Sequence, residues 1–78
     1  MPTLLRIDGF RFYFYSHEPG EPAPVHVDKG PATAKVWLAA VSVARDIGFA
    51  AHDLQRIRRL VDAHRDAFRE AWDDFFGT

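Results

Sequence analysis

The clearest structural signal in this sequence lies in Thr3-Leu4-Leu5-Arg6-Ile7-Asp8-Gly9-Phe10-Arg11-Phe12-Tyr13-Phe14-Tyr15-Ser16. Asp8-Gly9 accepts positive φ at both central positions of a type I′ turn, so it predicts a tight hairpin between strands 3–7 and 10–16. Side chains alternate along a strand, so the turn also fixes the two faces. The predicted cross-strand pairs are Ile7 with Phe10, Arg6 with Arg11, Leu5 with Phe12, and Leu4 with Tyr13. One face then carries Leu5, Ile7, Phe10, Phe12 and Phe14, and the other carries Leu4, Arg6, Arg11, Tyr13 and Tyr15.

The same alternation resumes after a proline-rich loop over residues 17–24. Residues 25–28 and 33–38 read as further strands, separated by a turn at Lys29-Gly30-Pro31. Residues 41–44 either extend the sheet or form a short irregular piece. These strands add Val25, Val27, Ala34, Val36 and Leu38 to the inner face, and His26, Lys35 and Trp37 to the outer face.

A helix is predicted from about residue 51 to 76, because apolar residues recur there at helical spacing. Gly77 supplies the stop signal. The apolar stripe consists of Leu54, Ile57, Val61, His64, Phe68, Trp72 and Phe75. The expected fold is therefore a single α+β domain over residues 1–78. A small antiparallel sheet of three to five strands, at about 3–44, packs on one long C-terminal helix. One helix covers one face of the sheet, so the other face stays open.

Composition narrows the classes of function. The chain has no cysteine, which excludes disulfides, thiolate catalysis and cysteine metal sites. It has 10 Lys+Arg against 11 Asp+Glu, so binding that depends mainly on neutralising phosphates is disfavoured. No run approaches the roughly 18 apolar residues that span a bilayer, and the N-terminus does not resemble a signal peptide. We expect a cytoplasmic protein with no membrane partner and no cofactor.

The open face is the candidate binding surface. It displays Arg6, Arg11, Tyr13, Tyr15, His26, Lys35 and Trp37. Aromatic side chains interleaved with cations stack nucleic-acid bases and hold phosphates in several small folds. The same residue types are enriched in the hot spots of protein interfaces. A third interpretation is an ordinary solvated face with cross-strand pairs.

His26 is the one candidate catalytic residue. Beside Tyr13, Arg11 and Lys35 it could act as a general acid or base in RNA cleavage, where the 2′-hydroxyl of the RNA is the nucleophile. If the protein is an enzyme, we therefore expect a metal-independent ribonuclease. The plainer interpretation is a strand histidine hydrogen-bonded at a loop edge. The sequence has no glycine-rich phosphate loop, no nucleophile triad and no metal-ligand motif, so a non-enzymatic role is favoured.

Several segments resemble domain-of-unknown-function family 4160. They are Met1-Pro2-Thr3, residues 9–16, Glu21-Pro22 with Val25-His26-Val27, residues 34–38, Gly48-Phe49, and the helix with terminal Trp72. The resemblance implies a small bacterial protein, often encoded beside another small protein in a toxin–antitoxin-like arrangement. It also implies a His-x-His motif whose first position is here Pro24, and a helix-capping Ser or Thr that is here Ala50. These departures weigh against a two-histidine site and predict a poorly capped helix.

Three hypotheses follow. The first is a protein-binding component of a toxin–antitoxin-like pair, which holds a small protein encoded nearby through the open face. The second is an RNA-binding or RNA-cleaving effector that uses the same face and His26. The third is a structural homodimer, packed sheet to sheet or through its helices, without a catalytic role.

Overall fold

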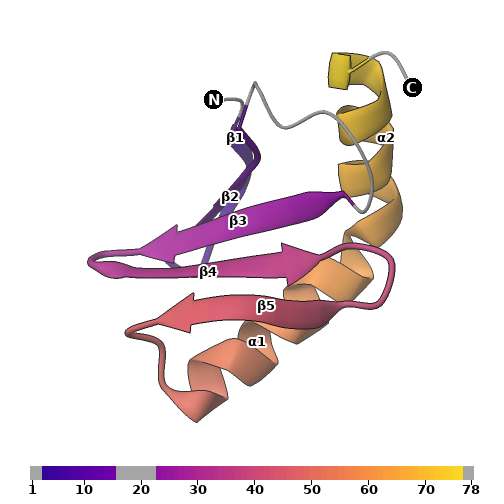
Figure 1. The fold of residues 1–78 in the computed structure, drawn as a ribbon. Helices are drawn as coiled ribbons and strands as arrows, with labels where there is room; N and C mark the ends of the chain where they lie inside the picture. The colour runs from indigo at the N-terminus through magenta and orange to yellow at the C-terminus, as the bar shows by residue number, and fades with distance from the viewer. Residues whose placement is uncertain (1–2, 16–22, 77–78) are drawn as a thin grey trace.

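The computed structural model describes residues 3–15 and 23–76, and this part of the chain forms five strands and two helices (Figure 1). The strands pair in chain order as one antiparallel sheet. The predicted α+β class is confirmed. The elements are β1 (Thr3–Ile7), β2 (Phe10–Tyr13), β3 (Pro24–Lys29), β4 (Ala32–Trp37), β5 (Ser42–Ile47), α1 (Ala51–Ala63) and α2 (Arg65–Phe76).

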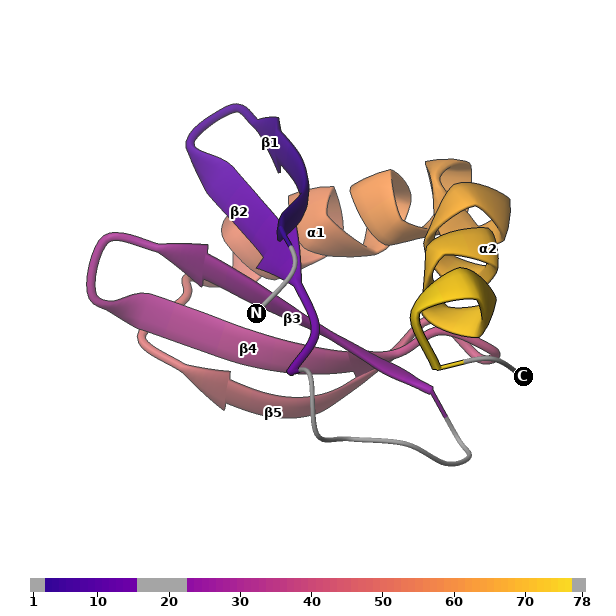
Figure 2. The ribbon, with the colours of Figure 1, turned by 90° about the horizontal axis from the view of Figure 1, so that it is seen from above.

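Both helices lie on one side of the sheet, and β1 and β2 curl toward them (Figure 2). The core forms between these layers. The rings of Phe12 and Phe68 lie 5.6 Å apart, and those of Phe14 and Trp72 lie 5.4 Å apart. The predicted inner face is therefore confirmed. The fully buried residues of the core include Phe12, Phe14, Val25, Val27 and Val36 on the inner-face side. The helices contribute Ile57, Val61 and Trp72.

The hairpin turn has the predicted geometry. Asp8 has φ of 53° and Gly9 has φ of 83°, so both central residues are left-handed, as a type I′ turn requires. The pairs Ile7–Phe10, Arg6–Arg11 and Leu5–Phe12 are confirmed. The fourth predicted pair is wrong, because Tyr13 lies opposite Thr3.

A bulge in β1 explains why Tyr13 lies opposite Thr3 and not opposite Leu4. Leu4 is the extra residue between the paired residues Thr3 and Leu5. Its side chain therefore leaves the open face and lies beside Phe14 and Phe75 on the helix side. The predicted strand over residues 10–16 is shorter than expected, because β2 ends at Tyr13 and Phe14 and Tyr15 follow it. Ser16 lies outside the described residues.

Residues 41–44, whose structure the sequence left open, contribute to β5. This strand is longer than the sequence suggested and reaches Ile47. It also contains a bulge, because Lys35 pairs with Arg45 while Val36 pairs with Val43, leaving Ala44 as the extra residue. Within the described chain, both edge strands of the sheet are thus interrupted, which discourages pairing with a further strand.

The predicted helix over residues 51–76 is divided at His64, which has φ of −109° and ψ of 12°. The Leu60 carbonyl accepts hydrogen bonds from both the backbone N–H of His64, at 3.0 Å, and its Nδ1, at 2.9 Å. The break lets α2 change direction (Figure 1) and lay Phe68 and Trp72 onto β2 and the residues that follow it.

The helical stripe is confirmed in part. Ile57, Val61, Phe68 and Trp72 are buried, as is Leu60, which the stripe did not include. Phe75 is 47% exposed. Ala50 occupies the N-cap of α1 in an extended conformation and makes no side-chain cap, as the sequence predicted. No helix in the described ranges is long and apolar enough to span a membrane.

Candidate binding surface

The open face is built around one row of side chains that crosses four strands. Tyr13 on β2 lies opposite His26 on β3, His26 lies opposite Lys35 on β4, and Lys35 lies opposite Arg45 on β5. Directly opposed residues in an antiparallel sheet point to the same face. Because the neighbouring Phe12 packs on α2, this row points away from the helices.

Tyr13 and His26 are more buried than predicted, with 4% and 8% of their surfaces exposed. The expectation that both face solvent is therefore wrong. The helices do not cover them. Instead the rings pack on one another, with centroids of Tyr13 and His26 5.4 Å apart and those of Tyr15 and His26 4.4 Å apart. Three aromatic side chains placed close together, on β2, just after β2 and on β3, bury their own faces.

Asp28 anchors this cluster from the neighbouring row. Its Oδ1 accepts a hydrogen bond from the Tyr13 hydroxyl at 3.1 Å and another from the Thr33 hydroxyl at 2.7 Å. Burial raises the pKa of Tyr13 above its ordinary value, and hydrogen bonds with Tyr15 and Asp28 add to the rise. Tyr13 therefore keeps its proton at neutral pH and acts as a fixed donor.

Cations lie over two of the aromatic rings. The Arg11 guanidinium is 4.5 Å from the centre of the Tyr13 ring, and the Lys35 ammonium is 4.8 Å from the centre of the Trp37 ring. Arg11 Nε also donates to the Thr3 hydroxyl at 3.1 Å. Cation–π contacts of this kind hold both partners in defined positions. The surface is therefore preorganised, and one face of each ring is already occupied.

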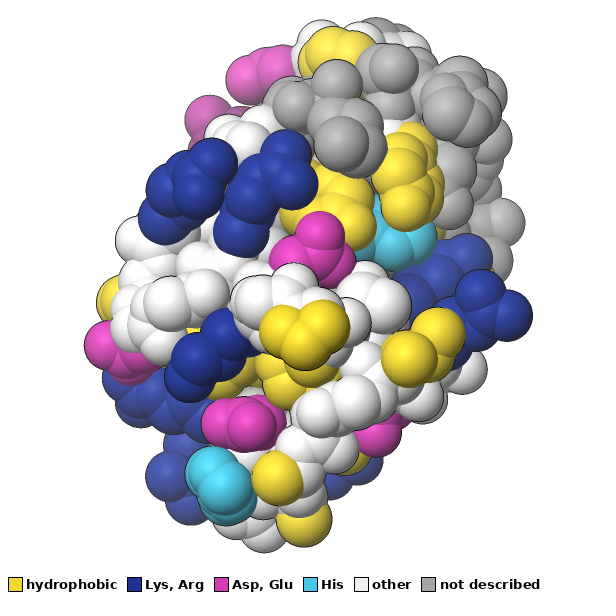
Figure 3. Space-filling model, turned by 90° about the vertical axis from the view of Figure 1, so that its left-hand side faces the viewer, with side chains coloured by type: hydrophobic (Ala, Val, Ile, Leu, Met, Phe, Trp, Pro, Cys, Tyr) yellow, Lys and Arg dark blue, Asp and Glu magenta, His cyan; other side chains and the backbone are white. Residues whose placement is uncertain are grey.

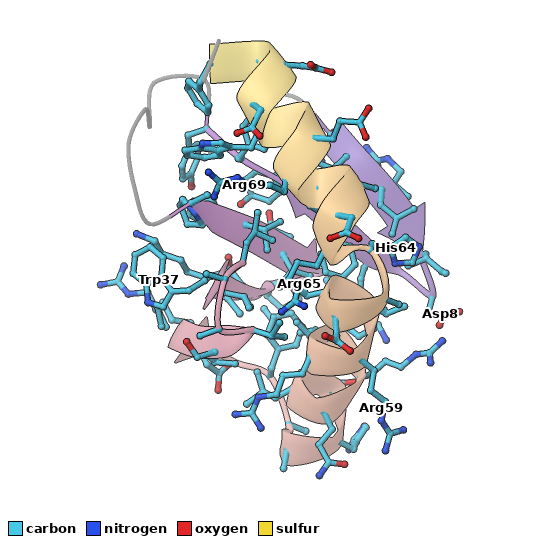
Figure 4. The ribbon with its side chains drawn as sticks, turned by 90° about the vertical axis from the view of Figure 1, so that its right-hand side faces the viewer. Asp8, Trp37, Arg59, His64, Arg65 and Arg69 are labelled. Atoms are coloured by element: carbon cyan, nitrogen blue, oxygen red, sulfur yellow. The ribbon has the colours of Figure 1, made fainter. Side chains whose placement is uncertain are left out.

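The remaining candidate residues lie where the sequence placed them. Arg6 is exposed, and Arg11, Tyr15, Lys35 and Trp37 are half-buried. Figure 4 shows Trp37 on the side of the strands that faces away from α1 and α2. All seven predicted residues thus belong to the open face, five of them with surface available for contact.

A hollow of about 270 Å³ opens on this face beside the central row, and it is lined by Tyr15, His26, Thr33, Ala34, Lys35, Arg45 and Ile47. Sequence reasoning missed Arg45 and Ile47 because it did not predict β5. Both are exposed, Ile47 by 53%. In Figure 3, basic side chains lie on both sides of a central group of hydrophobic, histidine and acidic side chains.

The described residues offer no other obvious chemistry. In the ranges 3–15 and 23–76, no group of three or more His, Asp or Glu side chains is arranged to hold a metal ion. His52 and His64 lie at the start of α1 and at the helix junction, away from the open face.

Fold and surface together define a small α+β domain whose sheet is covered on one side and displays an aromatic and basic surface on the other. Residues 9–73 match the family described as Domain of unknown function (DUF4160), and the chain belongs to that family. No curated protein and no solved structure matches the chain.

Proposed function

We propose that this protein is the protein-binding component of a toxin–antitoxin-like pair, and that it holds a small partner protein through the open sheet face. One observation carries the proposal. The helices leave uncovered a preorganised cluster in which Trp37 and Tyr15 retain accessible surface. Trp, Tyr and Arg are the residue types that dominate protein-interface hot spots.

The sheet edges support a face rather than an edge as the binding surface. Extended peptides often bind by adding a strand to an exposed edge. Here the bulges at Leu4 and Ala44 interrupt the two edge strands of the described sheet. Bulged edges are a common device against strand addition. A partner would therefore gain more from side-chain contacts on the face than from backbone pairing.

RNA cleavage receives less support from the geometry. A general acid or base must come within hydrogen-bonding distance of the reacting hydroxyl. His26 is only 8% exposed and is packed between Tyr13 and Tyr15. Tyr13 keeps its proton and so does not serve as a base at neutral pH. Base stacking is also disfavoured, because Lys35 already covers one face of Trp37.

The resemblance to the family adds the class of partner, a second small protein encoded beside this one. The test is to co-express the two, purify one through a tag and measure affinity by calorimetry. Trp37→Ala should weaken binding by at least about tenfold, as expected for a hot spot. Phe75→Ala is the matched control, because Phe75 is an exposed aromatic residue on the helix side. The proposal fails if the two proteins do not associate, or if both variants bind like the parent.

A further inference from the structure

An apolar groove lies on the helix side of the molecule, between β1 and the last turns of α2. Its volume is about 410 Å³, and it is lined by Leu4, Phe14, Ala71, Asp74 and Phe75. The Phe75 ring is 47% exposed, although edge-to-face contacts hold it 5.4 Å from Phe14 and 5.0 Å from Phe76. Among the described residues, the other large hydrophobic side chain with this much exposed surface is Ile47, on the open face. Phe75 and its groove therefore mark a second, separate apolar surface.

The rim of this groove is acidic. Asp74 lines the groove and Glu70 lies one helical turn before it, and both side chains are exposed. The ionisable residues three or four positions from Glu70 in α2 are all acids, namely Asp66, Asp73 and Asp74. Asp73 accepts an ion-pair contact from Arg69 Nε at 3.3 Å. Glu70 and Asp74 form no ion pair within residues 3–15 and 23–76.

This distribution of charge is unfavourable for α2 itself. Like charges four residues apart on a helix repel one another, and Glu70 has such a neighbour on each side, Asp66 and Asp74. Asp73 and Asp74 also lie in the last turn, where the helix dipole has its negative end, and no basic residue accompanies them there. Cations supplied by another molecule would relieve both effects.

We propose that this groove, with Glu70 and Asp74 on its rim, is a docking site for a basic amphipathic helix of another protein. A large apolar side chain of that helix would enter the groove beside Phe75, and its lysines or arginines would face the two carboxylates. Amphipathic helices commonly bind in this way, with apolar anchors seated in a groove. Glu70 and Asp74 are about 6 Å apart along α2, so cations at positions i and i+4 of the docked helix would match them.

The charge of the rim distinguishes this occupant from others. Glu70 and Asp74 would repel the phosphates of a nucleic acid or of an anionic lipid surface. A second copy of the chain could not use its own α2, because two acidic helices would then lie side by side. Its α1 carries three arginines but exposes no large apolar side chain that could enter the groove. The site lies on the covered side of the sheet, so the inference does not depend on the proposed function of the open face.

The test uses a short fluorescein-labelled helical peptide with leucine on one face and lysine at positions i and i+4 of the other. The same peptide with glutamine in place of lysine is the neutral control. Phe75→Ala removes the apolar wall of the groove, and Ile47→Ala is the matched change to an exposed hydrophobic residue of the open face. Glu70→Lys reverses a charge on the rim, and Asp62→Lys makes the same change in net charge at an exposed position of α1.

Fluorescence anisotropy should show that the lysine peptide binds at least about tenfold more tightly than the glutamine peptide. Phe75→Ala should weaken binding about tenfold, as expected for an aromatic hot spot. Glu70→Lys should weaken it about five- to tenfold, because an attraction becomes a repulsion. Ile47→Ala and Asp62→Lys should each change affinity less than about twofold. The absence of binding, or equal effects of each variant and its matched control, would overturn the proposal.

A thermal melt without the peptide shows that lost binding is not lost folding. Glu70→Lys places a cation among Asp66, Asp73 and Asp74, so the melting temperature of the unbound protein should rise by about 2–5 °C. A variant that is more stable and binds less well is the expected signature of a surface kept for a basic partner. A variant that melts below the parent would show that the acids carry no cost and would overturn that step.

Two further measurements locate the occupant. Trp37→Ala should bind the peptide like the parent, since Trp37 lies on the open face; lost binding in this variant would place the peptide there and overturn the proposal. Analytical ultracentrifugation of the protein alone should show a monomer at the concentrations used for anisotropy. A dimer that Phe75→Ala dissociates would identify a second copy of the chain as the occupant of the groove, and would also overturn it.

Discussion

Two phenylalanines on α2 give a quantitative test of how the helices pack. Phe68 is 3% exposed, and its ring lies 5.6 Å from that of Phe12. Phe75 is 47% exposed and lies 5.4 Å from Phe14. Both residues belong to the stripe that the sequence assigned to the core. The structure distinguishes them, so truncating each to alanine should have different effects.

Phe68→Ala removes a fully buried ring and leaves a cavity, which should lower the free energy of unfolding by about 3–5 kcal/mol. The whole stability of a 78-residue domain is about 4–12 kcal/mol, so this loss takes a large fraction of it. Phe75→Ala removes a ring that is only half buried and opens no closed cavity. This substitution should lower the free energy of unfolding by about 1 kcal/mol.

Urea unfolding followed by tryptophan fluorescence measures both losses, because Trp72 lies in the core. With an m-value of about 1 kcal/mol/M, the midpoint should fall by about 3 M or more for Phe68→Ala and by about 1 M for Phe75→Ala. Phe12→Ala should match Phe68→Ala, since it removes the other half of the same contact. Equal midpoints for Phe68→Ala and Phe75→Ala would refute the assignment of α2 to the sheet.

Three further changes test local features. Ala50→Ser supplies the missing side-chain cap of α1, and the free energy of unfolding should rise by about 1 kcal/mol in a thermal melt; no change would mean that another group already satisfies the helix start. Gly9→Val forces a β-branched residue to a φ of 83° and brings its Cβ within 3.2 Å of the Lys29 side chain, so the melting temperature should fall sharply; an unchanged melt is inconsistent with the type I′ turn. Tyr13→Phe tests the raised pKa. The folded state holds this proton more tightly than the unfolded state, so the associated stability is complete below about pH 10 and falls as the pH rises beyond it. Urea titrations at pH 8 and at a pH above 10 should show this alkaline loss in the parent and a smaller one in Tyr13→Phe, and equal slopes would contradict it.

The hairpin and the inner face could be predicted from the sequence because local chemistry determines them. Asp8-Gly9 selects one turn type, and the turn fixes the register of the pairs next to it. The bulge at Leu4 could not be predicted, because Leu4 and Leu5 are equally apolar and either can face the core. Packing against Phe14 and Phe75 decides the outcome.

The second feature that the sequence did not predict is β5, which carries part of the binding surface. The turn before this strand contains no glycine, proline or asparagine, and Val41 adopts a φ of 50°, which β-branched residues rarely do. No rule of turn composition marks such a turn. Without β5, the sequence did not predict that Arg45 lies opposite Lys35, or that Arg45 and Ile47 line the hollow on the open face.

Neither the burial of Tyr13 and His26 nor the break at His64 follows from local sequence. Alternation says which face a side chain occupies, but it does not say how closely neighbouring side chains cover one another. The helix has no proline or glycine at His64 to signal a break. After the break α2 packs on β2, which curls toward the helices, and such tertiary packing is a property of the assembled fold.

The central claim, that a protein partner binds the open sheet face, can be tested with the two tryptophans. Trp37 lies on the open face, whereas Trp72 is buried between α2 and the sheet. Each has one indole N–H, so a ¹⁵N-labelled sample gives one reporter for each side of the sheet. Adding the unlabelled small protein encoded beside this one should shift the Trp37 indole signal and leave that of Trp72 in place. A shift confined to Trp72, or binding that moves neither indole signal, would contradict the account.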